Sequence, residues 1–175
     1  MSNKVYIAVS LDGYIADTNG EINWLSMIPM TEELQSEFTN FMDGVDCLVM
    51  GRNTFETVKS FGEWPYDKKV FVASSSMKMI PNGYEEKIEL LNASALEIVK
   101  SLNEKGYKNL YIDGGKTIQN FLKEGLIDEL IISTIPIVLG GGRALFAEIP
   151  SPATFKLVGS KIISKLIVQT HYQKV

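Results

Sequence analysis

Short, nearly continuous apolar runs alternate along the chain with stretches in which apolar residues recur every three or four positions. The runs have the length of buried parallel strands, and they cover residues 4–11, 45–50, 69–73 and 110–112. The periodic stretches have the spacing of amphipathic helices, and they cover residues 31–43, 52–58, 94–106 and 116–125. The alternation predicts an α/β protein whose sheet is parallel at its centre and flanked by helices.

The C-terminal part of the chain has strand patterns without helices between them. Residues 130–139 are apolar and too long for one ordinary strand, so we expect a bend at Pro136, followed by a break at glycines 140–142. Residues 155–158 and 162–172 then predict two antiparallel strands, and a weaker strand is expected at 87–91. The fold class predicted is a mixed, mostly parallel sheet with antiparallel C-terminal strands. No repeat or linker interrupts it, so residues 1–175 are expected to form one domain.

Two helix starts have clear capping signals. Thr31 precedes Glu32 and Glu33, which are acidic residues in the turn where the helix dipole favours them. Ser94 and Glu97 have the spacing of a capping box.

Composition excludes several function classes. The chain of 175 residues has a net charge of −4 and 45% hydrophobic residues, which argues against a nucleic-acid surface. No apolar run approaches the roughly 18 residues of a membrane span. Because Cys47 is the only cysteine, no internal disulfide can form, and a cytoplasmic location is expected. With His171 as the only histidine, zinc sites and Ser-His catalysis are disfavoured, and no metal is expected.

Three predicted strand ends share the same kind of chemistry. Glycines, hydroxyl side chains and cations cluster at residues 51–54, 74–76 and 113–117. In an open α/β sheet such ends gather at one edge, and a glycine turn at a helix start suits a phosphate. Neither glycine motif is a standard dinucleotide or P-loop fingerprint, and a tight turn without a ligand is the alternative for Gly114-Gly115. The residues alone therefore indicate a nucleotide or polyphosphate ligand.

Four motifs in order resemble the dihydrofolate reductase superfamily over nearly the whole chain. They are IAVSLDG at 7–13, VMGRNT at 49–54, VASS at 72–75 and IDGGK at 112–116. Within that superfamily, SLDGYIA at 10–16, the Asp113-Gly114-Gly115 turn and residues 135–142 resemble most the reductase domain of riboflavin biosynthesis, the RibD C-terminal domain type. Many members of this branch are small stand-alone proteins.

The resemblance implies NADPH as the cofactor. The residues that match cofactor-contacting positions are Ala8 and Ile15 at the nicotinamide, Gly51, Arg52, Asn53 and Thr54 at the phosphates, Ser74 and Ser75 at the ribose 2′-phosphate, and Gly114, Gly115, Lys116 and Thr117 at the pyrophosphate. Arg52 with Ser74 suits a 2′-phosphate rather than the plain ribose of NAD. Asp113 is assigned to the same site, where it either bonds a cofactor or substrate group or caps the following helix.

The expected reaction is hydride transfer to a C=N or C=O carbon, and its proton donor is open. If Phe41 sets the register of the first helix, Glu37 faces the substrate; if Phe38 sets it, Leu34 does and no acid is present. Asp12 is the other candidate catalytic acid, unless Asp12-Gly13 is only a turn. Candidate substrate-binding residues are Phe38, Phe41 and Trp24, the last either part of a lid or a core residue.

Three functions remain open at this point. The first is an NADPH-dependent reductase of the riboflavin type acting on a ribosylaminopyrimidine or similar heterocycle, with Arg143, Lys161 and Lys165 as candidates for a substrate phosphate. The second is a dihydrofolate reductase in the strict sense, and the third is an NADPH-binding protein without turnover. No zinc deaminase half is expected because its ligands are missing. The resemblance also implies a homodimer.

Overall fold

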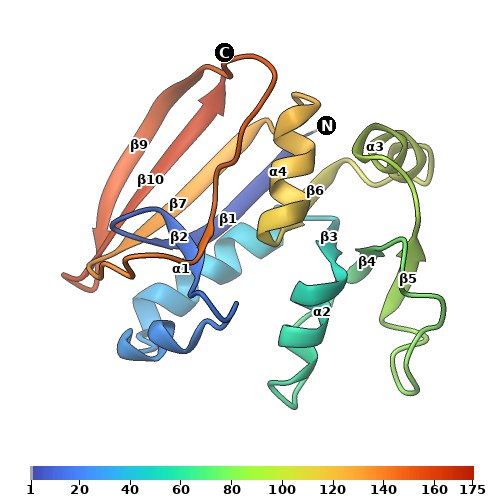
Figure 1. Ribbon diagram of the computed structural model, residues 1–175, viewed down its shortest axis with the longest axis horizontal. Helices are drawn as coiled ribbons and strands as arrows, with labels where there is room; N and C mark the ends of the chain where they lie inside the picture. The colour runs from blue at the N-terminus through green and yellow to red at the C-terminus, as the bar shows by residue number, and fades with distance from the viewer. Residues whose placement is uncertain (1) are drawn as a thin grey trace.

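The computed structural model describes residues 2–175 and has an eight-stranded main sheet in the order β5-β4-β3-β6-β1-β7-β10-β9 (Figure 1). Its strands are β1 (Ser2–Ser10), β3 (Cys47–Gly51), β4 (Lys69–Ala73), β5 (Ile88–Leu91), β6 (Asn109–Asp113), β7 (Glu129–Ile135), β9 (Phe155–Ile163) and β10 (Ile167–Lys174). The pairs among β1, β3, β4, β5, β6 and β7 are parallel, and β10 pairs antiparallel with β7 and β9. The predicted fold class is therefore confirmed.

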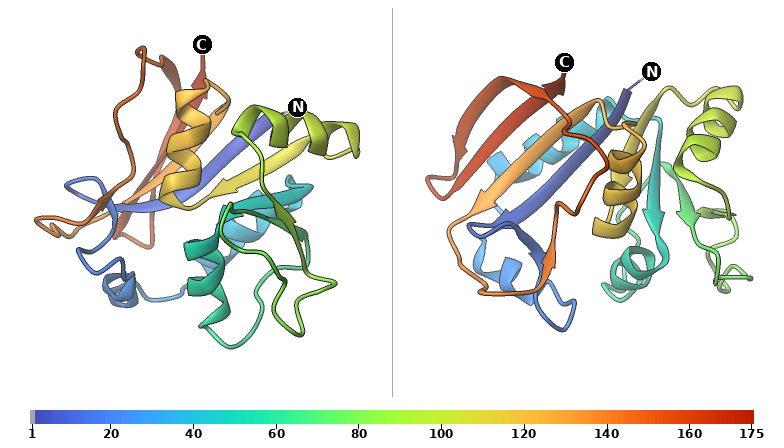
Figure 2. Two further views of the ribbon diagram at one scale, coloured as in Figure 1. Left: turned by 45° about the vertical axis from the view of Figure 1, so that its right-hand side comes forward. Right: turned by 45° about the horizontal axis from the view of Figure 1, so that its top comes forward.

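Helices cover both faces of this sheet (Figure 2). They are α1 (Glu32–Asp43), α2 (Arg52–Lys59), α3 (Ala95–Glu104) and α4 (Gly115–Lys123), with a short 3-10 helix, η1 (Asn23–Met27). On one face, α3 and α4 pack on alternate strand residues such as Val5, Val49 and Phe71. On the other face, α1 and α2 pack on the intervening residues, such as Leu48 and Val72. Both core clusters follow from the period of two along each strand.

Local capping explains where two helices begin. The Thr31 hydroxyl accepts a hydrogen bond from the Leu34 N–H (3.2 Å), at the start of α1. At the start of α3 the Ser94 hydroxyl accepts from the Glu97 N–H (3.3 Å), and the Glu97 carboxylate accepts from the Ser94 N–H (2.8 Å). Both predicted caps are confirmed.

Replacing Ser94 with alanine should lower the free energy of unfolding by about 1 kcal/mol, because α3 loses one half of its capping box. Urea denaturation measures the change. Ser36→Ala is the control, since Ser36 is exposed within α1 and its replacement should leave stability unchanged or slightly higher. Equal losses in both variants would contradict the capping role.

The C-terminal boundaries differ from those predicted. β7 ends at Ile135, directly before Pro136, which has no N–H to donate to a neighbouring strand. β9 continues through Gly159 to Ile163, whereas a break at 159–161 was expected, and the hairpin turns at Ser164 and Lys165, both with positive φ. The sequence misplaced this turn because a glycine lies inside the strand and none lies in the turn.

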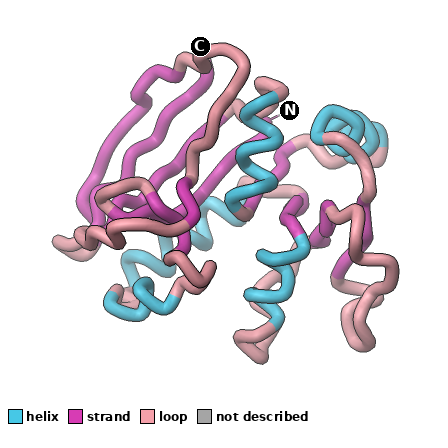
Figure 3. The backbone as a smooth tube through the Cα atoms, viewed as in Figure 1, coloured by secondary structure: helices cyan, strands magenta, loops and turns pink. Residues whose placement is uncertain are grey.

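A small two-stranded sheet, which the sequence did not predict, lies within the connecting loops (Figure 3). It pairs β2 (Tyr14–Ala16) with β8 (Arg143–Ala144). The two strands are too short to have a recognisable hydrophobic period. Their pairing ties the segment after β1 to the segment after β7.

Candidate functional site

A large cavity opens where the parallel strands end. It has a volume of about 980 Å³ and is lined by residues at the carboxyl ends of β1, β3, β4 and β6 and in the first turns of α2 and α4. Parallel strands bring these ends to one edge of the sheet, at which open α/β sheets bind ligands. β4 and β1 are separated by β3 and β6, so the carboxyl ends of these two strands lie about 14 Å apart.

All the residues assigned to the cofactor from sequence line this cavity. They are Ala8, Ile15, Gly51, Arg52, Asn53, Thr54, Ser74, Ser75, Asp113, Gly114, Gly115, Lys116 and Thr117. The tertiary structure thus brings four separate motifs to one place. Their binding of NADPH stays a prediction.

At the β4 end of the cavity, a cation lies beside a group of hydroxyls. Arg52, the first residue of α2, donates from Nη1 to the Ser76 hydroxyl (3.2 Å). The Ser74 hydroxyl accepts hydrogen bonds from the N–H groups of Ser76 (3.3 Å) and Met77 (3.0 Å), which fixes the turn after β4. The N-cap of α2 is Gly51, without a capping side chain, so the first N–H groups of this helix are available to a ligand.

Gly114 and Gly115 bring the start of α4 against its neighbours. Gly114 has φ 86° and ψ 136°, a conformation open only to glycine, and a Cβ there would overlap the Thr54 Oγ1. A Cβ on Gly115 would lie 2.5 Å from the Ile15 Cδ1. α4 also lacks a capping side chain. Two uncapped helix N-termini, each with a partial positive charge, therefore converge on one cavity.

Asp113 is the acid among the residues that line this cavity. It is the last residue of β6, partly buried, and its Oδ1 accepts a hydrogen bond from the Gly114 N–H (2.8 Å). Burial raises the pKa of Asp113 from 3.8 to about 6, and this outweighs the Gly114 hydrogen bond, which lowers it. Burial also raises the pKa of the neighbouring Tyr66 and Tyr111, so both phenols stay protonated.

The opposite end of the cavity, near β1, is apolar. Ala8, Ile15, Ala16, Ile22 and Leu25 line it. β8 closes this end, where the Arg143 guanidinium packs so closely on Gly20 that a Cβ at residue 20 would lie 2.5 Å from Nη2. The cavity therefore has a polar, cationic end at β4 and, near β1, an apolar wall with the Arg143 guanidinium at its edge.

Asp12 lies outside the lining of this cavity. Its carboxylate accepts hydrogen bonds from the Ser10 hydroxyl (2.6 Å) and from the N–H groups of Leu139 (3.1 Å) and Gly140 (2.8 Å). These bonds, above all that from Ser10, hold the pKa of Asp12 below its ordinary value. Of the two roles left open for Asp12, its contacts match the turn rather than the catalytic acid.

Glu37 also lies outside the large cavity. Its carboxylate pairs with Lys161 of β9 at a second cavity beneath α1. Leu34 instead packs in the apolar cluster that contains Ala8. No residue of α1 lines the large cavity, so the structure does not distinguish the two registers of this helix, and Glu37 as the catalytic acid stays a prediction.

The three aromatic residues assigned to the substrate are packing residues in this structure. Trp24 packs with Ile135 and Ile163 in one cluster, while Phe38 and Phe41 pack on another with Tyr6. None of the three lines the large cavity. Of the phosphate candidates, Arg143 lines it, whereas Lys161 lies at the second cavity.

Sequence reasoning missed several lining residues, above all Tyr6, Tyr66 and Tyr111. Tyr6 and Tyr111 each stand two positions before an assigned residue, Ala8 and Asp113, so the strand period places them on the same face. That signal was available. Tyr66 lies in an irregular loop, where no period indicates direction.

Over residues 2–175, no group of three or more His, Cys, Asp or Glu side chains is arranged to hold a metal ion. No helix within the same range is both long and apolar enough to cross a membrane.

Comparison with known proteins gives a consistent assignment. A model of the RibD C-terminal domain matches residues 4–168. Two proteins of Bacillus subtilis (strain 168), each named only as uncharacterized, match nearly their whole length: YwjB is 38% identical and covers 96% of this chain and 95% of its own, and YyaP is 31% identical and covers 95% and 91%.

Solved structures give the same result. A crystal structure from Shewanella sp. PV-4, whose name associates it with riboflavin biosynthesis, is 48% identical, has a TM-score of 0.95 and covers 100% of this chain and 99% of that one. The Thermotoga maritima diaminohydroxyphosphoribosylaminopyrimidine deaminase/5-amino-6-(5-phosphoribosylamino)uracil reductase has a TM-score of 0.77, and 56% of its chain is covered. At 16% identity that likeness shows the fold alone. The chain belongs to the RibD C-terminal domain family.

Proposed function

We propose that this protein is an NADPH-dependent reductase that transfers a hydride to a small heterocyclic substrate, such as a ribosylaminopyrimidine. The observation that carries the proposal is the convergence, in one cavity, of two uncapped helix N-termini, a cation with adjacent hydroxyls, and an apolar far end. Family membership supports the reductase class.

The residues present fit NADPH. The α2 and α4 N-termini suit its pyrophosphate, and Gly114 and Gly115 let the two helix starts approach closely, because a Cβ at either glycine would collide with Thr54 or Ile15. Arg52 and Ser74 suit a 2′-phosphate at the β4 end, about 14 Å from β1. Ala8 and Ile15 offer an apolar surface to the nicotinamide at the other end. The cofactor, when bound, supplies the hydride.

The protein contributes alignment, exclusion of water and a proton. The wall of Ala8, Ile15 and Leu25 keeps the reacting carbon in an apolar environment. As the hydride with its two electrons reduces a C=N or C=O carbon, the nitrogen or oxygen needs a proton. We assign that proton to Asp113, because it is the acid in the lining and its carboxyl is partly protonated near pH 6.

The two alternatives are less well supported. A strict dihydrofolate reductase would need an acid of α1 in the cavity, but no residue of α1 lines it and Glu37 pairs with Lys161. A binding protein without turnover would require the apolar end to be filled, whereas the cavity extends to Ala8 and Ile15.

NADPH oxidation followed by absorbance tests the proposal, with 5-amino-6-(5-phosphoribosylamino)uracil and dihydrofolate compared side by side. Turnover of the first supports the riboflavin-type assignment. Turnover of dihydrofolate alone would replace it with the second function. Tight NADPH binding without turnover of either would favour the binding protein, and failure to bind NADPH would contradict the proposal itself.

Replacing Arg52 with alanine should weaken NADPH binding by roughly 10- to 100-fold, the effect of losing a charge-assisted contact to the 2′-phosphate. NADH lacks that phosphate, so its affinity should change far less. Isothermal titration with both cofactors measures the two losses. Lys116→Ala is the matched control. Lys116 lies in the first turn of α4, which we assign to the pyrophosphate, so its loss should weaken the binding of NADPH and of NADH equally. Equal losses for Arg52→Ala would remove Arg52 from the 2′-phosphate role.

A further inference from the structure

A second cavity of about 470 Å³ lies beneath α1, against β7, β9 and β10. Its lining includes Lys4, Glu37, Glu129, Lys161 and His171. The large cavity lies at the carboxyl end of β1, and this one lies nearer the amino end, around Lys4. Two cavities thus share the α1 side of β1.

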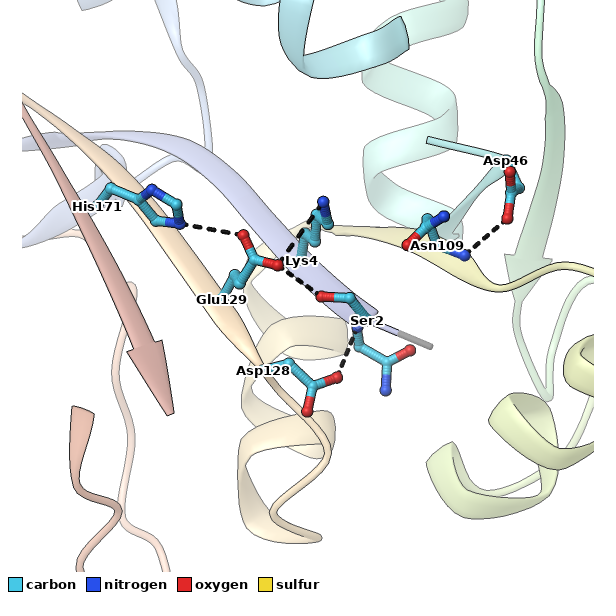
Figure 4. Close-up of polar contacts among 8 residues, drawn as sticks. Ser2, Lys4, Asp46, Asn109, Asp128, Glu129 and His171 are labelled. Atoms are coloured by element: carbon cyan, nitrogen blue, oxygen red, sulfur yellow. Dashed lines mark hydrogen bonds and ion pairs between the residues drawn. The ribbon is translucent and has the colours of Figure 1, made fainter. Parts of the chain in front are cut away.

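The charges around the second cavity are already paired with one another. Glu129 accepts a hydrogen bond from the Ser2 hydroxyl (2.8 Å), contacts the Lys4 ammonium (3.6 Å) and bonds the His171 ring (3.0 Å), as Figure 4 shows. Glu37 pairs with Lys161 on the other side. Because each carboxylate has a cationic partner, this lining does not indicate a site for a separate ion.

Among residues 2–175, Tyr6 is the one that lines both cavities. Its ring packs on Phe41 and Phe38, with ring centroids 4.8 Å and 5.6 Å apart. Its hydroxyl accepts a hydrogen bond from Gln169 Nε2 (3.1 Å), which also donates to the Ser133 hydroxyl (3.1 Å). Burial raises the pKa of Tyr6, so the phenol is neutral. The side chain is therefore held at both its ring and its hydroxyl.

We propose that the Tyr6 side chain sets the size of the substrate by closing the large cavity against the space beneath α1. This inference rests on the proposed function and adds a specificity residue to it. With Tyr6 in place, its side chain stands between the region beside Ala8 and the space beneath α1. Beyond Tyr6, the second cavity is lined by Gln169, a residue only 5% exposed, and its Nε2 loses the Tyr6 partner when Tyr6 is replaced, so that it is free to bond a second, fused ring.

The test compares two heterocycles that differ by one fused ring, isocytosine and pterin. In Tyr6→Ala the two cavities join. The ratio of pterin affinity to isocytosine affinity should therefore be at least about tenfold higher in this variant than in the wild type. Tyr6→Phe keeps the ring and removes only the hydroxyl, so it should show no gain. If Tyr6→Ala fails to fold, Tyr6→Leu serves as a second variant that opens the large cavity toward the second one, because leucine removes the phenol but keeps apolar volume at this position. Titration calorimetry, with and without NADPH, measures each affinity.

The proposal and the proposed function fail separately in this design. The affinity of the wild type for NADPH tests the cofactor assignment. The ratio of pterin affinity to isocytosine affinity tests the role of Tyr6. A folded Tyr6→Ala or Tyr6→Leu variant without a gain for pterin would overturn the inference, as would an equal gain in Tyr6→Phe. A crystal structure of the opening variant with two separate cavities would overturn it as well.

Discussion

Replacing Gly114 with alanine is expected to weaken NADPH binding at least about 100-fold and to lower the free energy of unfolding by roughly 2–5 kcal/mol. At φ 86° and ψ 136° the backbone of an alanine is strained. The added methyl group also overlaps the Thr54 Oγ1, so the first turn of α2 must move away from α4. Both proposed phosphate contacts are lost together.

Gly83→Ala is the matched control for that variant. Gly83 has nearly the same φ, 85°, but a Cβ there meets no atom within 4 Å. The free energy of unfolding should therefore fall by only about 1–2 kcal/mol, the cost of a positive φ at alanine, and the affinity for NADPH should not change. Thermal unfolding and cofactor titration measure both quantities. If the two variants lost the same stability and kept the same affinity, the close contact between α2 and α4 would not be what the site requires.

Replacing Asp113 with asparagine is expected to reduce kcat by roughly 10²- to 10⁴-fold, the usual contribution of a general acid. In the wild type the protonated carboxyl is the active form, so the rate should fall as the pH rises through about 6. The asparagine variant has no such group, and its residual rate should lose this dependence. Cofactor affinity should change much less than kcat. An unchanged pH profile in the variant would exclude Asp113 as the donor.

Although Asp113→Asn should lower kcat, the same substitution should raise the stability of the folded protein at neutral and higher pH. The pKa of Asp113 is raised from 3.8 to about 6 in the folded protein, so between these values the folded state binds more protons than the unfolded state. Wild-type stability therefore falls as the pH rises over this interval and stays lower above it. Asp113→Asn should be more stable than the wild type at pH 8 by roughly 1–3 kcal/mol, measured by urea denaturation. If the difference in unfolding free energy between the variant and the wild type were the same at pH 4 and pH 8, the burial of a charged Asp113 carboxylate would be contradicted.

Local signals located most of the site. The four motifs at strand ends, the capping residues Thr31 and Ser94, and the glycines at 114 and 115 are all defined by neighbours in the sequence. Because parallel strands bring their ends to one edge, strand order alone was enough to expect these motifs in one place. The single-domain organisation and the homodimer stay predictions.

The sequence by itself thus determined the order of the main-sheet strands and the α-helices, the family resemblance and the residues suited to a nucleotide, because these depend on local period, capping and turn chemistry. Only the tertiary structure decided which acid lies at the cavity. Asp12 is held by Leu139 and Gly140, Glu37 is paired with Lys161, and Asp113 has a raised pKa because other elements bury it. The position of Tyr6 between two cavities likewise depends on α1 and β10, which are distant in sequence, and no local pattern encodes such contacts.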